Sequence, residues 1–313
     1  MTRTVLVTGG AGFIGSHLVD ALLAGGRYRV RVLDDLSTGK RENLAHCADQ
    51  VELMVGDVRD PHLVAEATAG AWGVVHLAAV ASVTRSLEDP VLVNDINVGG
   101  TVTLLAAAGA AHVERLVFAS SCAVYGDPRK LPVSESTPVE PLSPYAAGKL
   151  AGEHYCRVLG AAAGIAATSL RFFNVYGPRQ DPGSEYSGVI SRFSNAALSG
   201  SSCVVCGDGL QSRDFVFVAD LADACVQALE QAPGRGEAVN VGTGSTTTLL
   251  GLIAALGAAS GTELAVEHAP RRDGDIRESQ ADIGLARALF GYAPHTRLEQ
   301  GLAETLAWYG AQR

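Results

Sequence analysis

Thr4-Val-Leu-Val-Thr-Gly-Gly-Ala-Gly-Phe-Ile-Gly-Ser-His17 is the stretch that decides the fold of this 313-residue chain. An apolar run, Val5 to Val7, leads into glycines at positions 9, 12 and 15 and then into a helical apolar pattern from Phe13 to Leu22. Such glycines let the backbone approach a pyrophosphate, which the amide groups at the start of the helix can bind. The first glycine interval is one residue longer than in the usual G-x-G-x-x-G. Strand, glycine turn and helix in this order still predict a dinucleotide-binding site.

A second predicted strand, Arg29 to Leu33, ends in Asp34, nineteen residues beyond Gly15. A carboxylate there can accept hydrogen bonds from the adenosine ribose hydroxyls and would repel a 2′-phosphate. Asp34 therefore favours NAD over NADP. Lys40 and Arg41 follow closely and leave the choice open, because basic side chains can accommodate a phosphate.

Strand and helix alternate through the first half of the chain. This alternation predicts an α/β protein with a doubly wound parallel sheet, whose ligand crevice lies at the carboxyl ends of the strands. Further strands are expected at 51–55, 74–77, 115–120 and 168–172, and helices near 61–69, 90–110 and 144–160. We expect a dinucleotide-binding domain over residues 1–173, a return to the sheet within 214–242, and a smaller substrate-binding region over 174–313.

Tyr145 and Lys149 stand out because the chain contains only three lysines against twenty-one arginines. Residues i and i+4 share one face of a helix, so an ammonium would lie close to a phenol. A nearby cation favours phenolate, and the sequence therefore predicts a lowered pKa for Tyr145, suited to a general base. Taken alone, this spacing also fits an ordinary pair on a helix surface.

Composition and charge exclude several classes of function. The net charge is −9 at pH 7, which does not suggest a nucleic-acid or membrane surface. We expect no hydrophobic run near the roughly 20 residues that span a bilayer. The first strand begins by residue 4, which leaves no room for a signal peptide, so a cytoplasmic location is expected.

Six scattered cysteines, at positions 47, 122, 156, 203, 206 and 225, are expected to be reduced thiols. Cys203-Val-Val-Cys206 has the C-x-x-C form of some metal sites. It reads instead as a short strand, in which the two thiols point to opposite faces. No metal is predicted.

Seven motifs together resemble the extended short-chain dehydrogenase/reductase superfamily. They are Thr8–His17, Leu33–Gly39, Gly56-Asp57, His76–Ala79, Ser120-Ser121 before Val124-Tyr-Gly126, Tyr145-x-x-x-Lys149 and Arg171–Gly177. Within it, the chain is most similar to the nucleotide-sugar 4-epimerases of the UDP-galactose and UDP-N-acetylglucosamine type. The resemblance implies a Rossmann-type fold, a UDP-sugar substrate and NAD. The NAD site that it implies comprises Gly9, Gly12, Phe13, Ile14, Gly15, Asp34, Ser37, Thr38, Gly39, Asp57, Val58, Leu77, Ala78, Ala79, Asn97, Tyr145, Lys149 and Phe172.

The family's mechanism assigns catalysis to three residues. Tyr145 would take the proton of the sugar's 4-hydroxyl while the nicotinamide accepts hydride from carbon 4. Lys149 would hold the nicotinamide ribose and lower the tyrosine pKa. Ser121 would hydrogen-bond the 4-oxygen. His76 also has acid–base chemistry, but its place on a buried strand favours a structural role.

Cys122 and Ala123 favour epimerisation over two related reactions. The resembling 4,6-dehydratases have a carboxyl pair at these positions, and the sugar-acid decarboxylases keep a glutamate at the second. An epimerase needs neither, because its 4-keto intermediate is reduced again. Cys122 has no assigned role.

The substrate side follows from the same resemblance. Arg213 and Arg272 would hold the diphosphate, a task that suits guanidinium groups. In the related epimerases, the residue four positions after the ribose-binding aspartate lies beside the sugar's 2-substituent, and here that residue is Ser279. Cys206 stands where an aromatic side chain commonly stacks on uracil, which leaves the base open. The full substrate set is Val83, Ser121, Asn174, Gly188, Val189, Cys206, Arg213, Arg272, Asp275 and Ser279.

A homodimer is also expected, with helices near 95–110 and 144–160 packing on their symmetry mates through small residues such as Ala106–Gly109, Ala146–Gly148 and Ala151-Gly152. Packing of the same residues within one chain is the alternative. Two other functions stay open. The chain could be a 4-epimerase of a sugar acid or another sugar nucleotide in secondary metabolism, or a non-catalytic NAD-binding sensor or scaffold.

Overall fold

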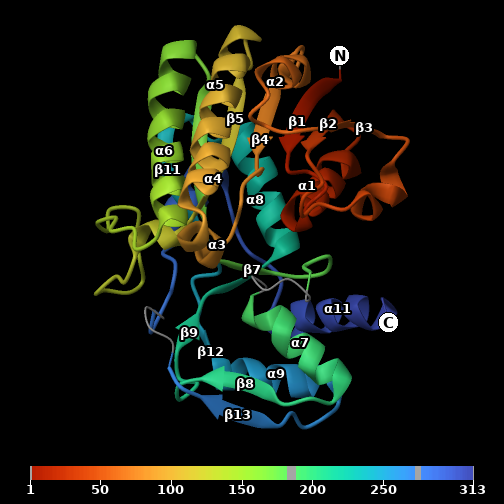
Figure 1. The fold of residues 1–313 in the computed structure, drawn as a ribbon, viewed down its shortest axis with the longest axis vertical. Helices are drawn as coiled ribbons and strands as arrows, with labels where there is room; N and C mark the ends of the chain where they lie inside the picture. The colour runs from red at the N-terminus through yellow and green to blue at the C-terminus, as the bar shows by residue number, and fades with distance from the viewer. Residues whose placement is uncertain (1, 182–187, 272–275, 313) are drawn as a thin grey trace.

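A parallel sheet forms the centre of the protein (Figure 1). The computed structural model describes residues 2–181, 188–271 and 276–312. Within them, seven strands pair in the order β11-β6-β5-β4-β1-β2-β3, all parallel. Their bounds are β1 (Arg3–Thr8), β2 (Tyr28–Asp34), β3 (Val51–Val55), β4 (Gly73–His76), β5 (Arg115–Ser121), β6 (Ala166–Phe172) and β11 (Arg235–Val241). The order reverses between β1 and β4, which is where ligands bind in such sheets.

Helices cover both faces of this sheet, which confirms the doubly wound fold. Helices α1 (Phe13–Ala24) and α8 (Val218–Gln231) pack on each other over one face. Helices α2 (Pro61–Thr68), α5 (Gly100–Ala110) and α6 (Pro144–Ala163) lie side by side over the other (Figure 1). Short helical segments join them: η1 (Arg41–Cys47), α3 (Val83–Glu88), α4 (Pro90–Asn94), the π-helical turn η2 (Asp95–Gly99) and η3 (Cys122–Tyr125).

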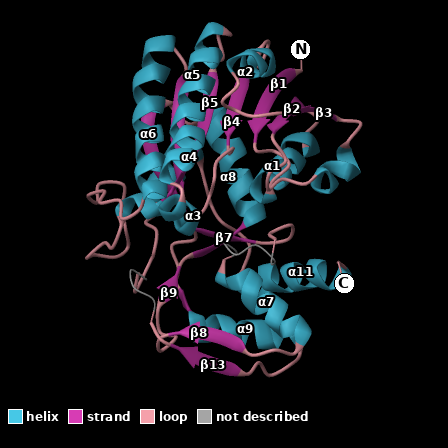
Figure 2. Ribbon diagram, viewed as in Figure 1, coloured by secondary structure: helices cyan, strands magenta, loops and turns pink. Residues whose placement is uncertain are grey.

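A second group of elements lies beyond the carboxyl ends of the strands (Figure 2). It has its own apolar core, which includes Tyr176, Phe193 and Leu252. Its elements are β7 (Asn174–Tyr176), α7 (Val189–Ser199), β8 (Cys203–Cys206), β9 (Ser212–Arg213), β10 (Phe215–Phe217), β12 (Thr247–Thr248), α9 (Leu249–Ser260), β13 (Val266–Ala269) and α11 (Leu298–Ala311). Helix α10 (Gly284–Phe290) instead contacts α8 and β11.

Part of the expected return segment, 214–242, joins the main sheet. Strand β11 does join the sheet beside β6. Strand β10, which we expected to belong to the return segment, pairs instead with β7 in a separate two-stranded sheet. The division of the chain at residue 173 stays a prediction.

The glycine turn after β1 is as tight as its sequence implies. Gly9 has φ +71°, and a Cβ placed on it would lie 2.8 Å from the backbone nitrogen of Ala78. A Cβ on Gly15 would lie 2.1 Å from the carbonyl oxygen of Gly9. Helix α1 can therefore begin directly over the end of β1.

One helical stretch corrects the expectation about membrane-spanning runs. Residues Pro90–Ala110 form a continuous helical run of 21 residues that is long and apolar enough to cross a membrane, judged by length and composition only. This run contacts α2 and α6 and buries two polar side chains, Asn97 and Thr101. Core helices of other proteins pass the same test, so the finding is weak evidence for a membrane segment.

Candidate active site

Two cavities meet at Tyr145. The first, of about 290 Å³, lies at the carboxyl ends of β1, β2 and β4. The second, of about 260 Å³, lies between the end of β5 and the segment around Ser279. Tyr145 and Phe172 line both cavities. A group at Tyr145 can therefore reach a molecule in either cavity.

The first cavity collects most of the residues predicted for the cofactor. Helix α1 begins there with Gly12 as N-cap, and no described side chain caps it. Its first amide groups are thus available for an anion. The predicted residues in the lining are Gly9, Gly12, Phe13, Ile14, Gly15, Asp34, Ser37, Thr38, Asp57, Val58, Leu77, Ala78, Ala79, Tyr145, Lys149 and Phe172.

Asp34 closes the end of this cavity formed by β2. Its two carboxylate oxygens accept hydrogen bonds at 2.9 Å from the backbone nitrogens of Ala11 and Leu36. Burial raises the pKa of Asp34, and these two hydrogen bonds act in the opposite direction. Lys40, which could have bound a phosphate, pairs with Asp181 at 2.9 Å.

Two predicted cofactor residues, Asn97 and Gly39, lie outside the described lining, and their assignment stays a prediction. Asn97 exchanges two hydrogen bonds with the backbone of Val80, at 2.8 and 3.1 Å, and so holds a residue that does line the cavity. Gly39 packs on Asp34, where a Cβ would come within 2.7 Å of Oδ1. Both residues support the wall instead of forming it.

The sequence prediction missed several residues of the same cavity. Most of them adjoin predicted residues at strand ends, and that adjacency could have identified them. They are Leu33, Asp35, Gly56, Val80, Ala81, Ile96, Ala119 and Ser120.

A dinucleotide fits the residues of the first cavity. Glycine backbone and the start of α1 suit a pyrophosphate, and Asp34 suits a ribose. Lys149 and Tyr145 lie at the other end of the lining, beside the second cavity.

Helix α6 positions the pair Tyr145 and Lys149. Ser143 caps the helix by accepting a hydrogen bond from the backbone nitrogen of Ala146, and Pro144 occupies the first turn. The Lys149 ammonium is buried, donates to the carbonyl oxygen of Ala119 at 2.8 Å, and lies 5.9 Å from the centre of the Tyr145 ring. Burial lowers the pKa of Lys149 to about 8.

The predicted lowering of the Tyr145 pKa is wrong for the protein by itself. Burial raises this pKa to about 12, and a hydrogen bond with Ser121 offsets only part of the effect. Desolvation disfavours the phenolate and is the largest effect on the Tyr145 hydroxyl. A positive charge beside the phenol would act in the opposite direction.

Ser121 and Cys122 form the wall between β5 and η3. Ser121 is the N-cap of η3 and accepts a hydrogen bond from the backbone nitrogen of Ala123 at 3.2 Å. Cys122 lines the second cavity, and burial raises its thiol pKa to about 12. The thiol therefore stays protonated and contributes a small apolar surface.

The second cavity brings together half of the predicted substrate residues: Val83, Ser121, Asn174, Arg213 and Ser279. Gly188 and Val189 lie instead at the start of α7, outside the described lining. Cys206 lines a separate cavity of about 130 Å³ that shares Ile276 with the second one. Arg272 and Asp275 lie outside the described residues.

Residues of this lining that sequence reasoning missed come mainly from two segments, the loop after η3 and the stretch after residue 275. No sequence pattern connects these segments, so only the fold could bring them together. They are Tyr125, Gly126, Pro128, Val133, Phe173, Ile276 and Glu278, in addition to Cys122 and Ala123.

His76 and a cluster of three potential metal ligands lie outside the two cavities. His76 bonds to the hydroxyls of Thr8 and Thr101, at 2.6 and 3.0 Å, and burial lowers its pKa to about 3, which fits the expected structural role. Asp20, His46 and Cys47 offer ligand atoms within 4.8 Å of one another, outside both cavities. Asp20 already pairs with His46 and with Arg179.

Known proteins are similar to this chain in sequence and in architecture. The UDP-glucose 4-epimerase of Mycolicibacterium smegmatis is 44% identical over 308 residues, which cover 97% of each chain. The structure of Thermus thermophilus UDP-glucose 4-epimerase in complex with NAD matches with a TM-score of 0.90 and 40% identity, over 99% of this chain and 100% of that one. The structure of a UDP-N-acetylglucosamine 4-epimerase from Methanobrevibacter ruminantium, in complex with UDP-N-acetylmuramic acid, matches with a TM-score of 0.95 and 36% identity over 99% of each chain.

The profile of one protein family matches residues 5–242, which span the glycine turn, the Tyr145–Lys149 pair and the last strand of the sheet. Together with a relative that is 44% identical over 97% of the chain, this match means that the protein belongs to the NAD dependent epimerase/dehydratase family.

Proposed function

We propose that this protein inverts carbon 4 of a UDP-hexose by way of a transient 4-keto sugar, as an NAD-dependent nucleotide-sugar 4-epimerase. The observation that carries the proposal is the place of Tyr145 between the two cavities, within hydrogen-bonding reach of Ser121 and beside Lys149. Names of relatives support the substrate class, because several of them are UDP-glucose 4-epimerases.

Tyr145 and Ser121 have distinct tasks in this reaction. Tyr145 takes the proton of the 4-hydroxyl and later returns it, and Ser121 holds the 4-oxygen. When bound, NAD would accept the hydride from carbon 4 and return it to the opposite face of the sugar ring. Its positive charge would favour the Tyr145 phenolate and so lower the phenol pKa.

The walls of the second cavity favour simple inversion. Cys122 and Ala123 carry no acid or base for removing water across carbons 5 and 6. Glu278 is the one carboxylate of the described lining, and its side chain is exposed at the rim. A carboxylate on the sugar would be repelled by the like charge of Glu278, which favours a neutral hexose over a sugar acid.

Incubation of the purified protein with a panel of UDP-sugars, without added cofactor, tests the proposal. The panel contains UDP-glucose, UDP-galactose, the two N-acetylhexosamine analogues and UDP-glucuronate, and NMR resolves the product epimers. We expect inversion of the neutral sugars. Inversion of UDP-glucuronate alone would support a sugar-acid epimerase, and binding of NAD without any turnover would support a sensor.

Cofactor choice gives a prediction of its own. We expect the affinity for NAD to exceed that for NADP at least tenfold, because Asp34 would face the 2′-phosphate with a like charge. Asp34→Ser should narrow this ratio. Isothermal titration of NAD-free protein measures both constants, and an affinity for NADP equal to or tighter than that for NAD would contradict the assignment.

The size of the sugar pocket leads to a second prediction. Ser279 lines the second cavity with a small side chain, so UDP-N-acetylglucosamine and UDP-N-acetylgalactosamine should be substrates as well. Ser279→Tyr should remove the acetylated pair selectively, by roughly 10- to 150-fold in kcat/KM, because a steric clash costs about 1–3 kcal/mol. Ser279→Ala, which adds no bulk, is the control. An equal loss on all four sugars would refute the placement of Ser279 beside carbon 2.

We also propose a homodimer. Its interface would consist of large apolar side chains instead of the small residues expected from the sequence. Two of the small residues of α5 and α6 serve packing within the chain: a Cβ on Gly152 would lie 2.3 Å from the Phe118 ring, and one on Gly109 would lie 3.0 Å from Ala163. Large apolar side chains face outward from α3, α4 and α6, which contact one another. These are Leu87, Val91, Tyr155 and Val158, exposed by 64, 70, 40 and 58%.

Charge placed on this surface should separate the protomers. We expect the wild type to have a dimer mass at micromolar concentration in light scattering, and Val91→Asp with Val158→Asp to have a monomer mass. Val204→Asp, at an apolar side chain that is 54% exposed on β8, is the matched control and should stay dimeric. A monomeric wild type would refute the dimer.

The cytoplasm remains the proposed location. All six cysteines are free thiols, as proteins of a reducing compartment usually have them.

A further inference from the structure

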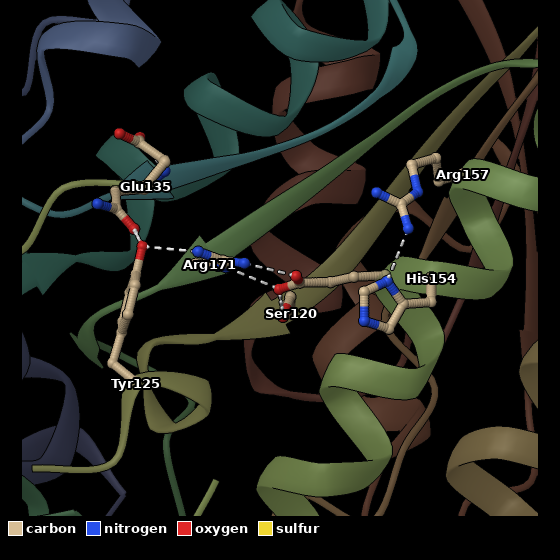
Figure 3. A network of polar contacts seen from close by, with 8 residues as sticks. Ser120, Tyr125, Glu135, His154, Arg157 and Arg171 are labelled. Atoms are coloured by element: carbon tan, nitrogen blue, oxygen red, sulfur yellow. Dashed lines mark hydrogen bonds and ion pairs between the residues drawn. The ribbon is translucent and has the colours of Figure 1, made fainter. Parts of the chain in front are cut away.

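A continuous chain of buried polar side chains begins at helix α6 (Figure 3). Arg171 of β6 donates from Nε and Nη2 to the two carboxylate oxygens of Glu153 of α6, at 2.9 and 2.7 Å. Both side chains are only 7% exposed. The Ser120 hydroxyl donates to the same carboxylate. The remaining arm of Arg171, Nη1, donates to the hydroxyl of Tyr125 at 2.8 Å.

Tyr125 connects this hydrogen-bond network to the wall of the second cavity. Its hydroxyl donates to Oδ1 of Asn240 at 2.7 Å, which fixes the orientation of the Asn240 amide. Asn240 Nδ2 then donates to the carbonyl oxygens of Val133 and Asp282, at 2.9 and 3.3 Å. Burial raises the pKa of Tyr125 to about 12, so the hydroxyl keeps its proton.

The segments that Asn240 holds contribute to the wall of the second cavity. Val133 pairs with Ala281 in a parallel bridge, in which the backbone nitrogen of Asp282 donates to Val133 at 2.8 Å. Val133 and Ser279 both line the second cavity. The amide of Asn240 therefore adds two hydrogen bonds to the backbone bridge that holds this wall.

The other end of this hydrogen-bond network holds helix α6, which carries Tyr145 and Lys149. Tyr145, Lys149 and Glu153 follow one another at intervals of four residues, so all three lie on one face of α6. The two parallel hydrogen bonds between Arg171 and Glu153 set both the rotation and the axial position of that face.

Stability alone does not explain so many buried polar groups. Replacing a buried ion pair with packed apolar side chains is often neutral or stabilising, because desolvation offsets the attraction of the charges. Directional hydrogen bonds, in contrast, specify a geometry. Epimerisation depends on such a geometry, because a misplacement of 1 Å can cost about 100-fold in rate.

We propose that Tyr125 is a positioning residue, whose hydroxyl aligns the sugar-binding wall of Val133 and Ser279 with the catalytic face of α6. This inference rests on the proposed epimerase function. Tyr125 takes no part in proton or hydride transfer, and its ring, which lines the second cavity, is retained in a phenylalanine variant.

Steady-state kinetics of Tyr125→Phe on UDP-glucose provide the test. We expect kcat to fall about 10- to 100-fold and KM to change less than threefold, since the arginine at 213 and the bound cofactor are untouched. The NAD content of the purified protein should equal that of the wild type. Tyr292→Phe is the matched control: it also removes a buried hydroxyl, which donates to Gly242 at 2.8 Å outside this network, and it should keep kcat within twofold.

A double-variant comparison tests the connection itself. If Tyr125 acts through Asn240, the combination of Tyr125→Phe with Asn240→Ala should lower kcat no further than the worse single change. Losses that multiply would overturn the proposal, and so would a kcat for Tyr125→Phe within twofold of wild type. An inactive wild type would overturn the proposed function and this inference with it, whereas an active wild type beside an unimpaired Tyr125→Phe overturns this inference alone.

Discussion

Tyr145→Phe should lower kcat by about 100- to 10,000-fold, the range that a positioned general acid–base group supplies. The substitution removes one oxygen, and the ring still fills the wall shared by the two cavities. Binding of NAD and of the UDP-sugar should therefore stay within a few-fold of wild type. Single-turnover NMR for the rate and isothermal titration for the two ligands measure these effects.

Ser121→Ala is the companion variant for this experiment. It removes the hydrogen-bond partner of Tyr145 but leaves the base in place, so its loss of rate should be smaller. Activity of Tyr145→Phe within tenfold of wild type would rule out Tyr145 as the base. Equal losses in both variants would show that the two hydroxyls act as one unit.

Lys149→Met should have two opposite effects, a loss of turnover of at least 100-fold and a gain in stability. Turnover falls because the ammonium beside Tyr145 is lost. Stability of the NAD-free protein rises at pH 7 because burial of the Lys149 charge, which lowers its pKa from 10.5 to about 8, opposes folding. The penalty is about 3 kcal/mol at most. The melting temperature should therefore increase by about 2–10 °C.

The pH dependence of this gain has a definite sign. Between pH 8 and 10.5 the folded protein releases the Lys149 proton while the unfolded chain keeps it, so the free energy of unfolding of the wild type rises with pH relative to the variant. The advantage of Lys149→Met should be fully present below pH 8 and shrink toward pH 10.5. Calorimetry at pH 7, 8.5 and 10 follows it, with the exposed Lys130→Met as control. An advantage that is equal at all three pH values would contradict the buried charge.

The strands and the cofactor site could be predicted because their signals are local. Alternating apolar runs and helical patterns determine where strands and helices form, and parallel strand ends meet at one edge of a sheet. This argument placed Gly9, Asp34 and Ala78 in one cavity although Ala78 lies 69 positions after Gly9. It could not show that Asn97 would turn to the backbone of Val80, because side-chain direction depends on packing.

The sugar side was predicted less completely for the same reason. Val133, Ile276 and Glu278 carry no motif, and they reach the cavity because the loop after η3 pairs with the segment around Ala281. The small residues of α5 and α6 were a further ambiguous signal. Only the fold shows that Gly152 packs on Phe118, inside the chain.

By itself, the sequence determined the doubly wound sheet and the dinucleotide site, because these depend on local patterns along single strands and helices. The choice of Tyr145, Lys149 and Ser121 as catalytic residues rested on the resemblance to the 4-epimerases and stays a prediction. Only the tertiary structure decided the energetics of that site. Desolvation raises the pKa of Tyr145 and lowers that of Lys149, because distant segments of the chain pack around both side chains. The ionisation of a side chain depends on everything packed around it, and the spacing of two residues on one helix records only one of those neighbours.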